Sequence, residues 1–129
     1  VAVNASKVAA HPEVRKELLK FQKDFAKKGG ILDGRDIGTV ICPDAEVKLF
    51  IDAKSEIRAH RRHLELNANQ ESISFETVLK QLTERDTRDM NRKNAPLKIA
   101  ATAHIIDTTD MTANDVFENA REIIDSIIF

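Results

Sequence analysis

The sequence predicts an α/β fold in which helices cover a parallel β-sheet, and three observations lead to this expectation. Short apolar runs that suit strands alternate along the chain with longer segments of helical periodicity. The strand-like runs are too short and too apolar for the strands of a sandwich. Several helical segments are bounded by residues that cap or break helices. Alternation of this kind is typical of parallel strands joined by crossover helices.

The first element is expected to be a helix from about residue 6 to residue 28, where apolar residues recur at helical spacing. Pro12 falls inside this span, so the helix should begin or kink there. The pair Gly29 and Gly30 should end it, because glycine is a poor helix former and is favoured just beyond a helix.

Residues 31–33 are expected to form a short buried strand that ends in a sharp turn carrying Arg35 and Asp36. Glycines at 34 and 38 are expected to permit backbone angles that other residues avoid, and to let the chain approach a ligand closely. Because open α/β folds bind their ligands at the carboxyl ends of strands, this turn is a candidate binding site.

The remaining elements alternate between strands and helices. We expect them at residues 47–52 (strand), 55–67 (helix), 74–92 (helix), 103–107 (strand) and 113–128 (helix). Ser55 can cap the first of these helices, and Pro96 closes the region after the second. Thr112 and Asp115 have the spacing of a capping box at the start of the last helix.

Composition limits the function classes that remain. The 129 residues suit one domain or part of one, with 42% hydrophobic and 32% charged residues. A net charge of −1 implies no bulk attraction to nucleic acid or to a membrane surface. No apolar run is long enough to span a bilayer and no secretory signal is visible, while a single cysteine fits a reducing cytosol. Three expected strands are few for such a sheet, and the chain starts at Val1, so we expect a piece of a longer protein.

A basic face is expected on the helix over residues 74–92. Arg85, Arg88 and Arg92 follow an i, i+3, i+7 spacing, so they share one side of that helix. Three guanidinium groups on one face repel each other unless an anion lies among them, and arginine suits forked binding of phosphate oxygens. The alternative is a solvated helix with ion pairs worth about 0.2–0.5 kcal/mol each. The segment taken alone leaves both interpretations open.

A second basic cluster consists of Arg58, Arg61 and Arg62, with His60 and His63 between and beside them. Taken alone, this cluster is typical of a charged exposed helix face. No acidic or cysteine partner follows the histidines in a metal-binding pattern, so no metal site is predicted.

Several short segments match the sequence pattern of a known protein family, and they follow one another in the same order as in that family. They are residues 6–10, 12–15, 34–40, 43–45, 47–53, 58–62, 84–92 and 95–97. Together they resemble the bacterial cytidylate (CMP) kinase family. The resemblance covers most of the chain and is far more specific than any one motif.

The resemblance implies a P-loop nucleoside-monophosphate kinase that transfers the γ-phosphoryl group of ATP to CMP or dCMP, giving CDP or dCDP. Residues 1–129 would be its C-terminal portion. This portion would comprise a remnant of the domain that binds the nucleoside monophosphate, together with the core, and about residues 58–92 would form a mobile lid. The implied roles fall into four groups of residues. They are Ser6, Arg15 and Asp36 for cytosine; Arg85 and Asp89 for the sugar; Arg35 and Arg92 for the CMP phosphate; and Arg58, Arg61 and Arg62 for a lid that closes over ATP. Arg35, Arg61, Arg62 and Arg92 would act on the transferring phosphates as catalytic residues.

The chain departs from the family pattern because it has no glycine-rich P-loop of the G-x-x-G-x-G-K type. ATP and Mg²⁺ would be held mainly by that absent part, so we expect the chain to be inactive alone. The implied partners are CMP, dCMP and ATP, in a cytoplasmic monomer without nucleic-acid or membrane partners. One alternative is a non-catalytic nucleotide-binding module without a P-loop. Another is an RNA-binding helix module, against which the near-neutral charge and the absence of Tyr and Trp argue.

Overall fold

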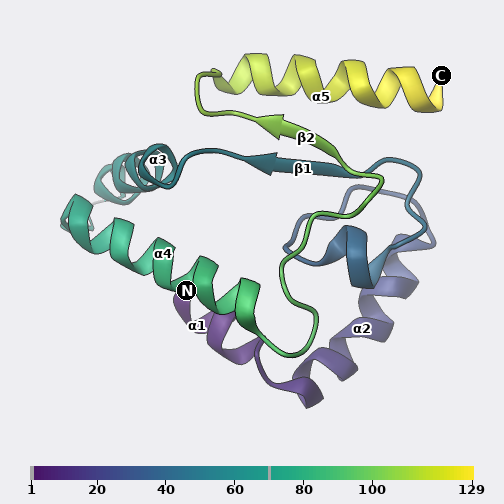
Figure 1. Cartoon of the computed structure of the whole chain (residues 1–129), viewed down its shortest axis with the longest axis horizontal. Helices are drawn as coiled ribbons and strands as arrows, with labels where there is room; N and C mark the ends of the chain where they lie inside the picture. The colour runs from purple at the N-terminus through teal and green to yellow at the C-terminus, as the bar shows by residue number, and fades with distance from the viewer. Residues whose placement is uncertain (1, 70) are drawn as a thin grey trace. The chain divides into compact units, whose positions relative to one another are not determined.

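The computed structural model describes residues 2–69 and 71–129, and for Ala2, Val3 and Ser6 it describes the backbone alone (Figure 1). The chain divides into two compact units, one of residues up to 48 with 85–103 and one of residues 49–84 with 104–129. Helix α4, Phe75–Asn91, belongs to the second unit in its first part and to the first unit in its last part.

The first unit contains α1 (Ala2–Val8), α2 (Pro12–Ala26) and a π-helix, η1 (Ile37–Ile41). The expected first helix is therefore two helices, and the break falls just before Pro12, which is the first residue of α2. Proline is well suited to this position because it has no backbone N–H, and an N–H in the first turn of a helix would have no carbonyl partner within the helix. As expected, α2 ends before the two glycines, where Gly29 has φ +79° and Gly30 has φ +139°.

The expected strand at residues 31–33 is wrong. The segment is irregular, and Ile31 is 91% exposed instead of buried. A strand needs a neighbour that takes up its backbone hydrogen bonds, and the sheet of the described residues consists of β1 and β2 alone. Sequence pattern could not reveal this lack of a partner, because an apolar triplet carries no information about pairing.

The turn that follows leads into a π-helix instead of the sharp turn expected from the sequence. The carbonyl of Asp36 accepts hydrogen bonds from the N–H groups of Val40 at 2.9 Å and Ile41 at 3.3 Å. The expected backbone angles of these glycines are also wrong, because neither Gly34 nor Gly38 has a left-handed φ, while the expected close approach to a ligand stays a prediction. At Gly34 an added Cβ would lie 3.0 Å from Cδ1 and Cγ1 of Ile37, so a larger residue would require that side chain to shift.

The second unit is built on a parallel pair of strands, β1 (Leu49–Asp52) and β2 (His104–Asp107). Leu49 pairs with His104 and Asp52 with Asp107, so both strands end in an aspartate at the same edge. Helix α5, Ala113–Ile128, packs along β2 (Figure 1). The predicted α/β class, a parallel sheet with flanking helices, is confirmed, with two of the three expected strands among the described residues.

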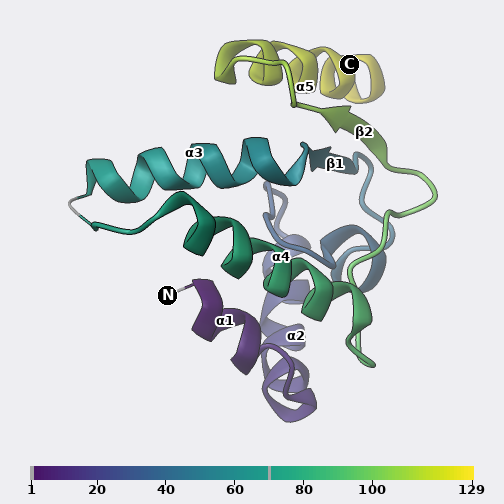
Figure 2. The same ribbon diagram turned by 60° about the vertical axis from the view of Figure 1, so that its left-hand side comes forward.

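Helix α3, Ser55–Ala68, and the first part of α4 form a hairpin in the second unit (Figure 2). Its core consists of Ala59, Leu66 and Val78, which are at most 8% exposed, with three flanking apolar residues: Ile73, Phe75 and Leu79. Ser55 is the first residue of α3 and not its cap, because Lys54 occupies the N-cap position without a side-chain hydrogen bond.

The capping box of α5 is confirmed. The Thr112 hydroxyl accepts a hydrogen bond from the N–H of Asp115 at 3.2 Å, and the Asp115 carboxylate accepts one from the N–H of Thr112 at 2.9 Å. These contacts satisfy two N–H groups at the start of the helix, which otherwise have no partner within it.

Candidate anion-binding site

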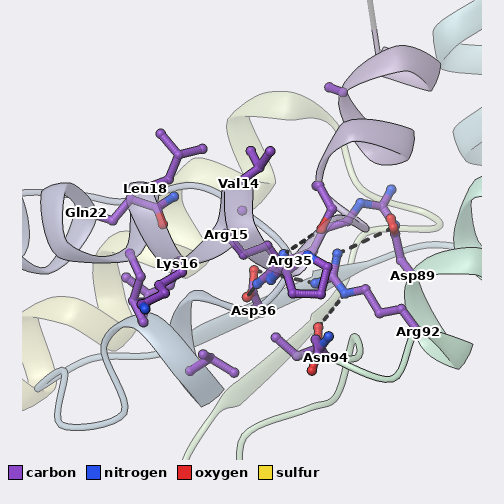
Figure 3. A pocket seen from close by; sticks show the side chains of 18 of the residues that line it. Val14, Arg15, Lys16, Leu18, Gln22, Arg35, Asp36, Asp89, Arg92 and Asn94 are labelled. Carbon is purple, nitrogen blue, oxygen red and sulfur yellow. Dashed lines mark hydrogen bonds and ion pairs between the residues drawn. The ribbon is translucent and has the colours of Figure 1, made fainter.

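A cavity of about 500 Å³ opens in the first unit among α1, α2, residues 34–41 and the segment around the end of α4 (Figure 3). The described charged side chains that line it are predominantly basic. They are Arg15, Lys16, Arg35, Arg85 and Arg92 against Asp36 and Asp89. Five basic and two acidic groups leave an excess of three positive charges, so the cavity attracts an anion.

Asp36 is held on one side of the cavity by the local fold. It is the N-cap residue of η1, and its carbonyl is fixed by the hydrogen bonds of that helix. Its carboxylate accepts a hydrogen bond from Arg15 of α2 and lies 3.6 Å from Nη2 of Arg92. The carboxylate is 9% exposed, so these two cations compensate a nearly buried charge.

Asp89 lies among three guanidinium groups. Its side chain is 2% exposed, and its Oδ2 is 2.9 Å from Nη1 of Arg35 and 3.7 Å from Nε of Arg85. Its Oδ1 is 3.7 Å from Nη1 of Arg92. The sequence left open what lies among the arginines of this helix face, and the structure shows that Asp89 supplies part of the required negative charge.

Arg92 is the most buried of the basic residues that line the cavity. Its side chain is 9% exposed, and its Nε donates a hydrogen bond to the carbonyl of Ala95. Within the described residues its buried Nη2 donates no hydrogen bond. Burial lowers the pKa of Arg92 from its ordinary value, and the positive charge of Arg15 lowers it further. Nη2 lies 3.6 Å from the carboxylate of Asp36, beyond hydrogen-bond distance, so a ligand oxygen that accepts its hydrogen bond would be stabilising.

The backbone after α4 holds Arg92 in place. The N–H of Leu97 donates to the carbonyl of Asp89 at 2.8 Å, which folds the chain back on the end of the helix. Ala95 has φ +49°, a left-handed conformation that costs a residue with a Cβ about 1 kcal/mol. Strain of this kind is often found at functional sites, where other contacts compensate it.

Asp86 was not among the predicted site residues, but its Oδ1 accepts a hydrogen bond from Nη1 of Arg35 at 2.9 Å. The i, i+3 spacing of Asp86 and Asp89 places both on one helix face and was visible in the sequence. The position of Arg35 between them depends on tertiary structure, which a single sequence does not contain.

Six of the predicted site residues come together at this cavity: Arg15, Arg35, Asp36, Arg85, Asp89 and Arg92. Ser6 belongs to α1, but its side chain lies outside the described part of the structure. The other predicted arginines belong to α3 in the second unit.

The α3 arginines have different surroundings. Arg61 donates hydrogen bonds to the hydroxyl of Thr108 at 2.9 Å and to its carbonyl at 2.6 Å, and it also reaches the carbonyl of Met111 at 3.3 Å. Arg62 pairs with Glu65 on the exposed surface at 2.8 Å. Arg61 therefore ties α3 to the loop between β2 and α5, a role that its place in a basic cluster did not suggest.

Arg58 lines a smaller cavity of about 380 Å³ at the carboxyl ends of β1 and β2. Its Nε donates to the carbonyl of Ala53 at 2.9 Å, and Asp52 and Asp107 lie at the same cavity. Among residues 2–69 and 71–129, no three His, Cys, Asp or Glu side chains lie together in a way that could hold a metal ion.

Comparison with known proteins identifies the family. A family model described as cytidylate kinase matches residues 1–126. A cytidylate kinase of Mesorhizobium japonicum is 45% identical over 126 residues, which are 96% of this chain and 58% of that protein. A cytidylate kinase of Salmonella choleraesuis is 52% identical over 123 residues, or 95% of this chain and 54% of that protein. The chain belongs to the cytidylate kinase family.

The family match confirms the predicted resemblance, and the small α/β structure is consistent with the C-terminal part of a cytidylate kinase fold. The chain spans little more than half the length of the relatives it matches, 58% and 54% in the two cases above. Within the described residues, no helix has both the length and the apolar character needed to cross a membrane.

Proposed function

We propose that the protein is a nucleoside-monophosphate kinase that transfers the γ-phosphoryl group of ATP to CMP or dCMP, and that the cavity of the first unit takes the acceptor nucleotide. The observation that carries the proposal is Arg92, which lines this predominantly basic cavity and whose buried Nη2 donates no hydrogen bond among the described residues, although Oδ1 of Asp36 lies 3.6 Å away. The matched relatives are named cytidylate kinase, which supports CMP as the acceptor. The volume of about 500 Å³ falls within the usual range for small-ligand sites.

Arg35 and Arg92 are assigned to the phosphate of CMP. They reach the cavity from different segments, so their guanidinium groups can bind phosphate oxygens from two directions. Phosphoryl transfer depends mainly on positioning and on neutralisation of charge, with little covalent work for the protein. Fixed guanidinium groups in a largely buried site supply both of these contributions.

Arg15 and Asp36 are assigned to the base, with Ser6 beside them. Cytosine presents an exocyclic amine that donates and ring atoms that accept. A carboxylate can accept from the amine while a guanidinium donates to the acceptors. In a base that has a carbonyl in place of the amine, this carbonyl would lie against the carboxylate of Asp36. Both groups are hydrogen-bond acceptors, and a buried contact between two acceptors is costly.

Arg85 and Asp89 are assigned to the sugar, where Asp89 can accept a hydrogen bond from a ribose hydroxyl. Arg58, Arg61 and Arg62 are assigned to the ATP side as part of a lid. Mg²⁺ would neutralise charge on the phosphates of ATP. The described residues form no cluster that fits it, so no step of this proposal depends on a magnesium ligand from this chain.

Isothermal titration calorimetry of the 129-residue chain with CMP, dCMP and cytidine tests the acceptor site. CMP and dCMP should bind, and cytidine should bind at least about tenfold more weakly, because charge-assisted hydrogen bonds to the phosphate are worth about 1.5–3 kcal/mol. Equal affinities for CMP and cytidine would contradict the proposal. Asp36→Ala should weaken CMP binding and narrow the difference between CMP and UMP.

A phosphoryl-transfer assay with ATP, Mg²⁺ and CMP tests the reaction. We expect the 129-residue chain alone to show little or no turnover, and a rate near that of a complete cytidylate kinase would contradict this expectation. Binding of CMP by a complete protein that transfers no phosphate would instead favour the non-catalytic nucleotide-binding module.

A further inference from the structure

We infer that Asp86 is a positioning residue, which holds Arg35 at the wall of the cavity and thereby sets the affinity for the phosphate of the ligand without touching it. The inference rests on the proposed function for the choice of a phosphate ligand. It concerns a residue outside the lining of the cavity, for which neither motif nor composition suggested a role.

The contacts of Arg35 carry the inference. Within the described part of the chain, both ion pairs of Arg35 use the same nitrogen, Nη1, which lies 2.9 Å from Oδ1 of Asp86 and 2.9 Å from Oδ2 of Asp89. A guanidinium has five N–H donors in a rigid planar fork. Two carboxylates at one end of the fork fix its orientation and leave its other donors for a ligand.

The two carboxylates differ in their relation to the cavity. Asp89 and Arg35 line it, whereas Asp86 does not. Asp89 also lies near Arg85 and Arg92, so its charge is shared among three cations. Asp86 gives Arg35 a second negative partner whose side chain is 14% exposed, behind the surface that a ligand would contact.

The helix makes this arrangement rigid. Asp86 and Asp89 are three residues apart in α4, so their side chains lie on one face about one turn apart. The guanidinium of Arg35 is fixed between two points of one helix. An alternative role for Asp86 is that of a counter-ion that a phosphate displaces from Arg35, and in that case Asp86→Ala would tighten CMP binding instead of weakening it.

The test compares CMP and cytidine binding by isothermal titration in the 129-residue chain, its Asp86→Ala and Asp86→Asn variants, and the control Thr87→Ala, an exposed neighbour on α4. Asp86→Ala should weaken CMP binding about three- to tenfold, the size expected for an ion pair coupled to a binding group. Asp86→Asn should lose less, because its amide oxygen still accepts from Arg35. The affinity for cytidine should not change in either Asp86 variant, and the control Thr87→Ala should bind CMP and cytidine as the unaltered chain does.

Coupling to Arg35 separates positioning from a general structural effect. In an Arg35→Ala background, Asp86→Ala should cause no further loss of CMP affinity. Tighter CMP binding by Asp86→Ala, an equal loss for cytidine, or a loss that adds fully to that of Arg35→Ala would each overturn the inference. If Asp86→Ala does not fold by circular dichroism, the same comparison with Asp86→Asn decides.

Failure of the proposed function has a different signature. If the unaltered chain does not bind CMP, the chain is titrated with inorganic phosphate instead. Binding is then monitored by NMR through the ¹⁵N resonance of Arg35 Nε. That resonance should respond at about three- to tenfold lower phosphate concentration in the unaltered chain than in Asp86→Ala. Equal responses, or none in either protein, would overturn the inference about Asp86.

Discussion

Replacement of Asp36 by asparagine should destabilise the ligand-free protein by about 3 kcal/mol. Loss of one partner from a buried ion pair costs about 3–5 kcal/mol, because the remaining charge stays buried without compensation. The side chains of Asp36 and Arg92 are each 9% exposed, so their pair falls within this class. Arg15 is 20% exposed, and asparagine can still accept its hydrogen bond, so we expect the lower end of the range.

Urea unfolding followed by far-UV circular dichroism at pH 7 measures this cost. The slope of free energy against urea should not change, so that the midpoint alone reports the loss of stability. Asp24→Asn is the matched control, since its pair with Lys27 at 3.5 Å joins side chains that are 53% and 78% exposed. Exposed pairs contribute about 0–1 kcal/mol. A cost for Asp36→Asn no larger than that of the control would refute the argument that Asp36 neutralises buried arginines.

Other predictions concern the last helix, the phosphate site and the α3 contact. Thr112→Ala should cost about 1 kcal/mol in urea unfolding at pH 7 through loss of the α5 cap. Hydrogen bonds from Thr112 lower the pKa of Asp115, so this contribution should be complete above about pH 4 and should shrink as the pH falls through the folded pKa. Arg92→Lys should weaken CMP binding at least tenfold in titration calorimetry, because lysine cannot reproduce the fork; unchanged affinity would remove Arg92 from the phosphate site. Arg61→Ala should speed amide hydrogen exchange at Met111 several-fold, and unchanged exchange would show that the contact does not hold this loop.

Features that depend on residues close in sequence could be predicted. The capping box of α5 is an example, because Thr112 and Asp115 satisfy each other's backbone within one turn, whatever the rest of the chain does. The break at Pro12 and the end of α2 before Gly29 likewise follow from local backbone chemistry. The parallel sheet was predictable from the alternation of elements, as two short apolar strands flanked by helices.

Features that depend on distant partners could not be predicted. Residues 31–33 have the composition of a strand, but the sheet of the described residues gives them no neighbour. The π-helix is an exception, because its hydrogen bonds join groups only five residues apart, but it has no simple sequence signature. The two roles that the sequence missed, Asp86 on Arg35 and Thr108 on Arg61, both join segments about fifty residues apart.

The site residues form a coupled set, which changes how substitutions in it should be interpreted. Asp89 is shared by Arg35, Arg85 and Arg92, and Arg92 also lies near Asp36. Removal of any one charge therefore alters the electrostatic balance of two or three others, and coupled neighbours commonly depart from additivity by about 0.5–3 kcal/mol. The assignments to base, sugar and phosphate name the group that each side chain would contact. Because Arg92 lies near both Asp36 and Asp89, its substitution should disturb the base site as well as the phosphate site, and only paired substitutions measured together can separate the two.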